Sequence, residues 1–141
     1  MIGVDPKRSA IMARVRGKNT KPELVVRRVV YALGHRYRLH RRDLPGSPDL
    51  VFRTKKRVIF VHGCFWHRHA GCRRTTFPKI RVPFWRSKFA QNIARDARNI
   101  ETLSEAGWKV LVVWECETDN SIALRVKLRR FLGQPRRVAK R

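Results

Sequence analysis

The segment from His62 to Cys72 concentrates side chains that can do chemistry. Its eleven residues include three of the five histidines and two of the three cysteines of the chain. Histidine and cysteine are the usual ligands of tetrahedral zinc, and a structural zinc takes four of them. Three could come from Cys64, His69 and Cys72. The spacing therefore predicts a structural zinc site that needs one further ligand from elsewhere in the sequence.

Two histidines of this segment, His62 and His67, remain for other chemistry. Imidazole titrates near neutral pH, so either side chain could accept a proton from an attacking water, and His67 is the first choice. The alternative for each is a zinc ligand or a phosphate contact. For His62, a strand-end residue without function is a further alternative.

Asp49 stands out among only ten acidic residues. It follows Pro48 and begins the apolar run through Phe52, where an isolated carboxylate is costly unless a turn caps it or a cation binds it. Both interpretations fit the local sequence, and the nearby histidines favour a metal. Mg²⁺ is satisfied by one or two carboxylates plus phosphate oxygens. Asp49 with a main-chain oxygen of Val61 would be enough at a phosphodiester.

The other carboxylates are less distinctive. Glu23 ends the motif Thr20-Lys21-Pro22-Glu23, which is typical of a capping box at a helix start, but it could instead be a second carboxylate or a histidine partner in the metal site. Asp96, Glu101 and Glu105 lie near arginines on a predicted helix. Solvated ion pairs are the predicted role of these three.

Phe65 and Trp66 are aromatic residues in what should be a loop. Packing in the core or around the zinc is the common use of such a pair. A functional alternative is a wedge inserted between base pairs, as architectural DNA-binding proteins use. Met12, in an arginine-rich N-terminal arm, could act in the same way.

Composition indicates a polyanionic partner. The 34 Lys and Arg exceed the 10 Asp and Glu, giving a net charge of +24. Nucleic acid is the first candidate, because phosphate contacts supply salt-dependent affinity, although a ribosomal-type basic protein has the same charge. No apolar run is long enough to cross a bilayer, and no apolar stretch typical of a secretory signal follows Met1. Three cysteines, an odd number, do not make a disulfide framework, and their grouping with histidine favours metal binding in a reducing cytoplasm.

The pattern of apolar residues predicts one α/β domain over 1–141, with a basic arm at 1–19 and a loose basic tail at 133–141. Turn residues and periodicity divide the rest into short elements. We expect helices at about 20–33, 84–106 and 121–132, and strands at 37–39, 49–53, 57–62 and 109–114, the last strand being buried on both faces.

Two geometric consequences follow from this order. A hairpin with its turn at 54–56 sets Asp49 opposite Val61 or His62. The third strand, the long helix and the last strand form a crossover unit, so these two strands run parallel and end at the same edge of the sheet. Cys64 and Cys116 lie just past those ends. Topology therefore predicts Cys116 as the fourth zinc ligand.

Several motifs together resemble one known family. They are Pro48-Asp49 at a strand start, the His62 to Cys72 segment, Phe84-Trp85, Arg95-Asp96, and Gly107 to Cys116. This pattern is similar to that of the very-short-patch repair (Vsr) mismatch endonucleases, over roughly residues 8–118. The resemblance implies a restriction-endonuclease-like fold, a mixed sheet flanked by helices. It also implies nicking of DNA on the 5′ side of the thymine in T·G mismatches left by deamination of 5-methylcytosine.

The resemblance assigns roles position by position. Asp49 becomes the Mg²⁺-binding catalytic carboxylate and His67 the catalytic histidine, with His62 and Glu23 as supporting residues. Zinc takes the four ligands named above, and the DNA wedge consists of Phe65, Trp66 and Met12. The strand 57–62 lacks the acid-x-Lys of the nuclease superfamily, and the Vsr branch uses a main-chain oxygen there, the position of Val61. A monomer and a functional link to a cytosine-5 DNA methyltransferase and repair proteins are further implications.

Two other functions remain open on the sequence. A non-catalytic, zinc-stabilised DNA-binding module would share the charge and the zinc ligands but would not need Asp49. A restriction-type nuclease would share the site but cleave intact duplex. We expect the mismatch endonuclease, acting in the cytoplasm on nucleoid DNA.

Overall fold

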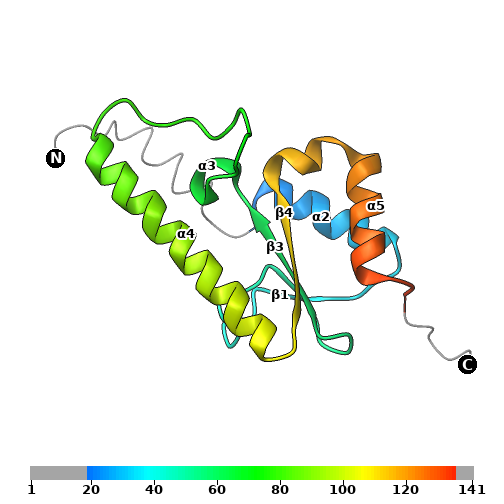
Figure 1. Ribbon diagram of the computed structural model, residues 1–141. Helices are drawn as coiled ribbons and strands as arrows, with labels where there is room; N and C mark the ends of the chain where they lie inside the picture. Colours follow the sequence, from blue (N-terminus) through cyan, green and yellow to red (C-terminus); the bar gives the residue numbers. More distant parts are fainter. Residues whose placement is uncertain (1–18, 136–141) are drawn as a thin grey trace, which may run out of the picture.

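The computed structural model describes residues 19–135 of the chain as a four-stranded mixed sheet flanked by helices (Figure 1). Met12 lies outside the described residues. The elements in chain order are α2 (Lys21–Ala32), β1 (Arg38–Leu39), β2 (Leu50–Phe52), β3 (Arg57–His62), α3 (Cys64–His67), α4 (Val82–Glu105), β4 (Lys109–Trp114), the 3-10 helix η1 (Glu115–Asp119) and α5 (Ser121–Leu132). No helix in the described part is long and apolar enough to span a membrane.

The first described helix begins and ends where its sequence signals predict. The Thr20 side chain accepts a hydrogen bond from the backbone N–H of Glu23, at 3.4 Å, and so caps α2. Leu33 is the C-cap, and Gly34 follows with a φ of +92°, a left-handed conformation that glycine adopts without steric cost. Only the backbone of Glu23 takes part in this cap, and its side chain contacts Arg27 and His40.

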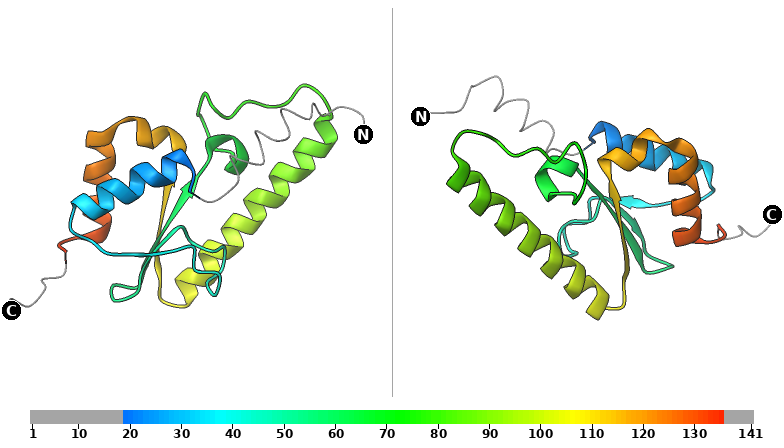
Figure 2. Two further views of the ribbon diagram at one scale, coloured as in Figure 1. Left: turned by 180° about the vertical axis from the view of Figure 1, so that it is seen from behind. Right: turned by 45° about the horizontal axis from the view of Figure 1, so that its top comes forward.

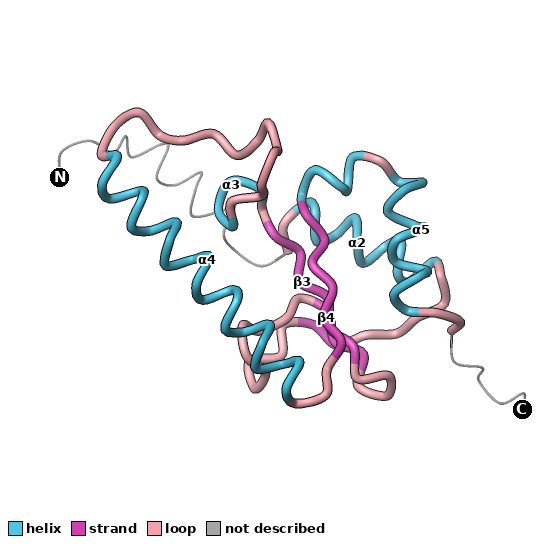
Figure 3. The backbone as a smooth tube through the Cα atoms, viewed as in Figure 1, coloured by secondary structure: helices cyan, strands magenta, loops and turns pink. Residues whose placement is uncertain are grey.

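Sheet topology confirms the predicted crossover. The strand order is β1-β2-β3-β4, with antiparallel pairing from β1 to β3 and parallel pairing between β3 and β4. Strands β3 and β4 lie side by side (Figure 3). His62 is paired with Trp114 at the carboxyl ends of the two parallel strands. Cys64 and Cys116 therefore follow neighbouring strand ends, as the topology requires.

The sheet has one hydrophobic core on each face, because side chains alternate along a strand. On one face, Leu50, Phe52 and Ile59 pack with apolar residues of α2 and α5. On the other, Val51, Val58 and Phe60 pack with Leu103 of α4. The two sets of helices lie on opposite sides of the sheet (Figure 2). This layering holds the carboxyl ends of β3 and β4 between α2 and α4.

Two strand predictions need correction. Phe52 pairs with Arg57, so the turn has four residues, and the register is one position away from the predicted pairing of Asp49 with Val61. Strand β4 is half-buried at an edge of the sheet, with only Val113 fully buried. Two of its backbone groups are covered by side chains, since Lys127 donates to the Val112 carbonyl and Glu117 accepts from the Trp114 amide.

The start of the predicted loose tail is also held in place. Lys55 donates to the carbonyls of Leu132 and Gln134, at 2.6 Å each. The His35 ring lies 3.2 Å from the Gly133 carbonyl. Residues 133–135 are therefore anchored to the hairpin turn, while 136–141 lie outside the described part.

Candidate active site and metal centre

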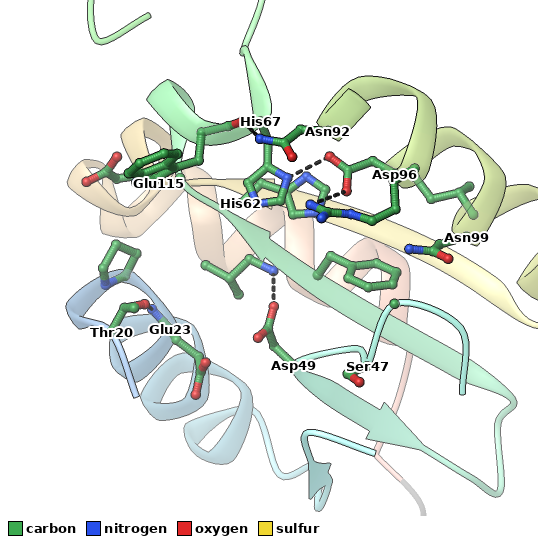
Figure 4. Close-up of a pocket in the computed structure, with 18 of the residues that line it drawn as sticks. Thr20, Glu23, Ser47, Asp49, His62, His67, Asn92, Asp96, Asn99 and Glu115 are labelled. Carbon is green, nitrogen blue, oxygen red and sulfur yellow. Dashed lines mark hydrogen bonds and ion pairs between the residues drawn. The ribbon is translucent and has the colours of Figure 1, made fainter. Parts of the chain in front are cut away.

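A pocket of about 670 Å³ opens at the carboxyl end of β3. It lies between the start of α2, the loop before β2, α3 and the middle of α4 (Figure 4). Asp49, Glu23, His62 and His67, the four residues predicted to be catalytic, all line it. The fold therefore brings together side chains from four separate segments of the chain.

Asp49 lies just before β2 and points into this pocket (Figure 4). Its Oδ2 accepts a hydrogen bond from the Val61 backbone N–H at 2.7 Å, so the predicted contact with Val61 forms despite the shifted register. Burial, followed by the nearby Glu23 carboxylate, raises the pKa of Asp49 to about 7. A buried carboxylate beside a second one is stabilised by a bound cation. Metal binding therefore fits this position better than turn capping.

Glu23 lies near Asp49, and two basic side chains form hydrogen bonds with its carboxylate. Its side chain accepts hydrogen bonds from Arg27, one turn along α2, and from His40, whose Nε2 lies 2.9 and 3.0 Å from the two carboxylate oxygens. Glu23 is only 2% exposed. The donor atoms of Glu23, His40 and Asp49 all lie within 4.8 Å of one another. Of the three predicted roles for Glu23, its side-chain geometry fits a second carboxylate beside Asp49 and a histidine partner, but not a capping box.

His67 forms the imidazole part of a carboxylate-imidazole pair. Its Nδ1 lies 2.6 Å from Asp96 Oδ2, on α4. Burial would raise the pKa of Asp96, but the hydrogen bond with His67 and its charge outweigh burial, and the net shift is downward. Asp96 is therefore an ionised partner that fixes the His67 ring. The predicted role of Asp96 as a solvated surface charge is wrong.

His62 stacks on the same ring. The His62 and His67 centroids are 3.8 Å apart and the planes differ by 7°. Burial, with a smaller contribution from His67, lowers the pKa of His62 to about 3, so His62 is neutral at physiological pH. Imidazole lone pairs lie in the ring plane, so two parallel rings cannot both aim at one ion. The arrangement suits proton transfer by His67 better than a shared metal.

The four predicted zinc ligands converge behind the pocket. Their ligand atoms lie within 4.8 Å of one another, and they come from α3, the loop after it and η1: Cys64, His69, Cys72 and Cys116. The distances from His69 Nδ1 to Cys64 Sγ and Cys116 Sγ are 3.7 and 3.4 Å. Tetrahedral zinc with ordinary bond lengths separates its sulfur and nitrogen ligands by about 3.5 Å. The donor set and its spacing therefore fit zinc.

Burial disfavours the thiolate form of two of these cysteines unless a cation is bound. Burial raises the pKa of Cys64 to about 12, and the Cys116 thiol is shifted upward for the same first reason. Backbone N–H donation at Arg74 lowers the pKa of Cys72. His69 is held by stacking on Trp114, with centroids 4.2 Å apart and planes 7° apart. Three neighbouring thiolates would repel one another unless a metal ion neutralised them.

Phe65 and Trp66 are packed in this structure. Trp66 is 8% exposed, and its backbone carbonyl accepts a hydrogen bond from the Asn92 side chain. Phe65 contacts Trp85 and Phe89 edge to face. The packing alternative describes both side chains here, and Trp66 is buried and does not project from the surface. A wedge role stays a prediction, one that would need these rings to leave their cluster.

The sequence analysis missed three residues of the site: Asp96, His40 and Asn92. Asp96 and Asn92 are one helical turn apart on α4, and both line the pocket. One signal in the sequence could have identified Asp96, because it is the first acidic residue after Asp49. His40 gave none, since its side chain reaches Glu23 only after β1 has paired with β2.

These features define a class: a basic, mixed α/β protein with a carboxylate-imidazole pocket suited to hydrolysis, next to a Cys3His cluster suited to zinc. Residues 4–74 match the family described as DNA mismatch endonuclease Vsr. The chain belongs to this family. The predicted family resemblance is thereby confirmed, and with it the broad class of DNA endonucleases.

Relatives align along most of the chain. It is 49% identical over 126 residues to the type II nicking enzyme V.XorIIP of Xanthomonas oryzae pv. oryzae, covering 89% of this chain and 92% of that protein. It is 41% identical over 128 residues to the type II nicking enzyme V.NmeAIP of Neisseria meningitidis, covering 91% of each. It is 40% identical over 109 residues to the DNA mismatch endonuclease Vsr of Escherichia coli, covering 77% and 69%.

Proposed function

We propose that this protein nicks double-stranded DNA on the 5′ side of the thymine in a T·G mismatch, the product of 5-methylcytosine deamination. The observation that carries the proposal is one pocket in which Asp49 lies near the His67–Asp96 pair, in a protein of net charge +24. The relatives named as nicking enzymes and as a mismatch endonuclease support the same activity. A restriction-endonuclease-like fold is part of the proposal, supported by the mixed sheet flanked by helices.

Two metal ions belong to the proposal. Asp49, with the main-chain oxygen of Val61, would hold Mg²⁺. The Val61 amide donates a hydrogen bond to Asp49. Because the carbonyl of a strand residue points to the same side as its own N–H, the Val61 oxygen also faces Asp49. When bound, Mg²⁺ supplies charge stabilisation at the phosphate and the leaving oxygen. Zinc would be structural, held by the Cys3His cluster, and would fix α3 against η1.

Proton transfer falls to His67. Because its Nδ1 is hydrogen-bonded to Asp96, Nε2 is left to accept a proton from the attacking water. Asp96 then stabilises the imidazolium that forms, as the carboxylate of a hydrolase triad does. His62, neutral and stacked on His67, orients that ring without adding charge. Glu23 is placed beside Asp49 as a supporting carboxylate.

Choice of a mismatch has a physical basis in the cost of distorting DNA. Separating or unstacking a base pair costs a few kcal/mol, and less where pairing is already poor. We propose the wedge residues Phe65, Trp66 and Met12 for this step. We also propose that the protein acts as a monomer in the cytoplasm, on nucleoid DNA, and in functional connection with a cytosine-5 DNA methyltransferase and repair proteins.

The test compares two end-labelled duplexes of the same sequence, one with a T·G mismatch and one with T·A, incubated with the protein and Mg²⁺. We expect a single nick 5′ of the mismatched thymine, formed at least about 100-fold faster than any cut in the paired duplex, a discrimination worth about 2.7 kcal/mol. Equal cleavage of both duplexes would instead indicate a restriction-type nuclease. Binding without cleavage would indicate a DNA-binding module.

A further inference from the structure

We propose that an exposed apolar ridge formed by Phe77, Ile80 and Phe84 is a second DNA-contact surface, which packs against the duplex beside the nick site. The ridge lies on the loop before α4 and on its first turn. This inference rests on the proposed function for the identity of the ligand, double-stranded DNA. It adds residues that neither the pocket nor the wedge includes.

The three side chains are unusually exposed for their size. Phe77 is 43% exposed, Ile80 63% and Phe84 45%. They belong to neither of the two hydrophobic cores of the sheet. The segment that carries them runs from α3 over to the start of α4, far from α5 (Figure 1). Exposed apolar side chains gathered on one segment indicate a contact surface, whereas single ones need no explanation.

The ridge is supported from below by aromatic rings. Phe77 contacts Phe89 edge to face, with centroids 5.6 Å apart, and Phe84 contacts Trp85 at 5.2 Å. Trp85 in turn lies 6.0 Å from Trp66, which lines the catalytic pocket. A continuous aromatic cluster therefore joins the ridge to the active site. A surface supported in this way can contact a ligand with little loss of side-chain entropy.

The charge around the ridge specifies the kind of partner. Residues 68–95 contain eight Arg and Lys and no Asp or Glu. Within the described part of the chain, only Arg74 and Arg95 among them form ion pairs with a carboxylate. Arg81 lies over the Phe84 ring, 4.5 Å from its centroid, so a cation is held at the ridge itself. A second copy of this positive surface would be repelled, whereas a polyanion would be attracted.

DNA offers both kinds of surface that this region needs. Its phosphates suit the unpaired arginines and lysines, and its sugars and base edges suit apolar side chains. The two contributions differ in their dependence on salt, since only neutralised phosphates release counterions. Apolar ridge contacts and arginine contacts can therefore be separated experimentally.

The test measures binding of a T·G duplex by fluorescence anisotropy over a range of KCl concentrations, with Ca²⁺ in place of Mg²⁺. For the double variant Ile80→Ala/Phe84→Ala we expect at least tenfold weaker binding with an unchanged salt slope. For Arg81→Gln/Arg86→Gln we expect weaker binding with a salt slope shallower by about two, since each phosphate contact contributes about 0.9. The matched control is Ile122→Ala/Val126→Ala, two exposed apolar residues of α5, which should bind as the wild type does.

Zinc content and circular dichroism show whether each variant is folded. The single variant Ile80→Ala, at the most exposed position of the ridge, provides a second measurement and should weaken binding at least threefold. Wild-type affinity of the folded double variant, or equal weakening by the α5 control, would overturn the proposal. Because anisotropy does not require cleavage, a wild-type protein that binds but does not nick would reject the proposed function and leave this result unaffected.

Discussion

The Cys3His cluster and the Asp49 pocket adjoin each other at the end of β3, yet they are assembled in opposite ways. Three of the four proposed zinc ligands lie within nine residues of sequence, from Cys64 to Cys72. The pocket takes its side chains from α2, the loop before β2, β3, α3 and α4. The Cys3His cluster therefore forms mainly from residues that are close in sequence. The Asp49 pocket forms only when the whole sheet and its helices have folded.

This difference assigns separate tasks to the two regions. His62 and His67 lie within the same segment as Cys64 and His69, so a metal bound by those two residues would also fix the position of the His67 imidazole relative to Asp96. In the proposed function, the zinc cluster would support the geometry and the pocket would perform the chemistry. A change in the Cys3His cluster should therefore abolish both folding and nicking. A change in the Asp49 pocket should abolish nicking alone.

The largest effect is expected from Cys116→Ser. It removes the one ligand that joins the local Cys/His segment to the end of β4, and a structural zinc contributes on the order of 10 kcal/mol to folding. We expect loss of zinc and of the cooperative thermal transition. Metal analysis and calorimetry provide the measurement. One equivalent of zinc with a wild-type transition in this variant would show that Cys116 is not a ligand.

A smaller effect, confined to the pocket, is expected from Asp96→Asn. The amide can no longer stabilise an imidazolium at His67, and loss of such a partner costs about 100-fold or more in rate. Zinc content, thermal stability and DNA affinity should stay at wild-type values. Arg98→Gln, a neighbouring change on the same helix, is the control. A nicking rate within threefold of the wild type would remove Asp96 from the mechanism.

The smallest effect is a dependence of stability on pH. In protein without Mg²⁺, burial and the Glu23 carboxylate raise the pKa of Asp49 from 3.8 to about 7. The folded state then binds more protons than the unfolded state between these values, so stability falls as pH rises toward 7. We expect a decrease of a few degrees in Tm from pH 5.5 to 7.5, absent in Asp49→Asn and reversed by Mg²⁺. Parallel curves for the two proteins would contradict the pKa assignment.

The same contrast explains what the sequence could and could not reveal. The Cys3His cluster was predictable because ligand type and spacing group Cys64, His69 and Cys72, and strand topology brings Cys116 to them. The position of Asp49 in a pocket was predictable because a lone carboxylate at the start of an apolar strand is costly unless a partner binds it. Asp96 was not, since a carboxylate among arginines on a helix usually forms surface ion pairs, and only tertiary packing turns it toward His67.

The details of the sheet show a similar limit. Helix ends were predictable from Thr20, Gly34 and Gly107, whose conformations depend on local sequence. The register of β2 with β3 was not, because a hairpin turn of three or four residues fits the same sequence, and Lys56 adopts a left-handed φ of +52° to complete the longer one. The edge position of β4 depends on how many strands the sheet has, which no single segment encodes.

The most direct test of the division between support and chemistry is Asp49→Ala assayed on a T·G duplex with Mg²⁺. The account predicts zinc content and mismatch binding close to those of the wild type, together with nicking reduced at least about 1,000-fold, because the carboxylate that would hold the metal is gone. Nicking at a rate near that of the wild type would contradict the assignment of Asp49 and, with it, the assignment of the chemistry to this pocket.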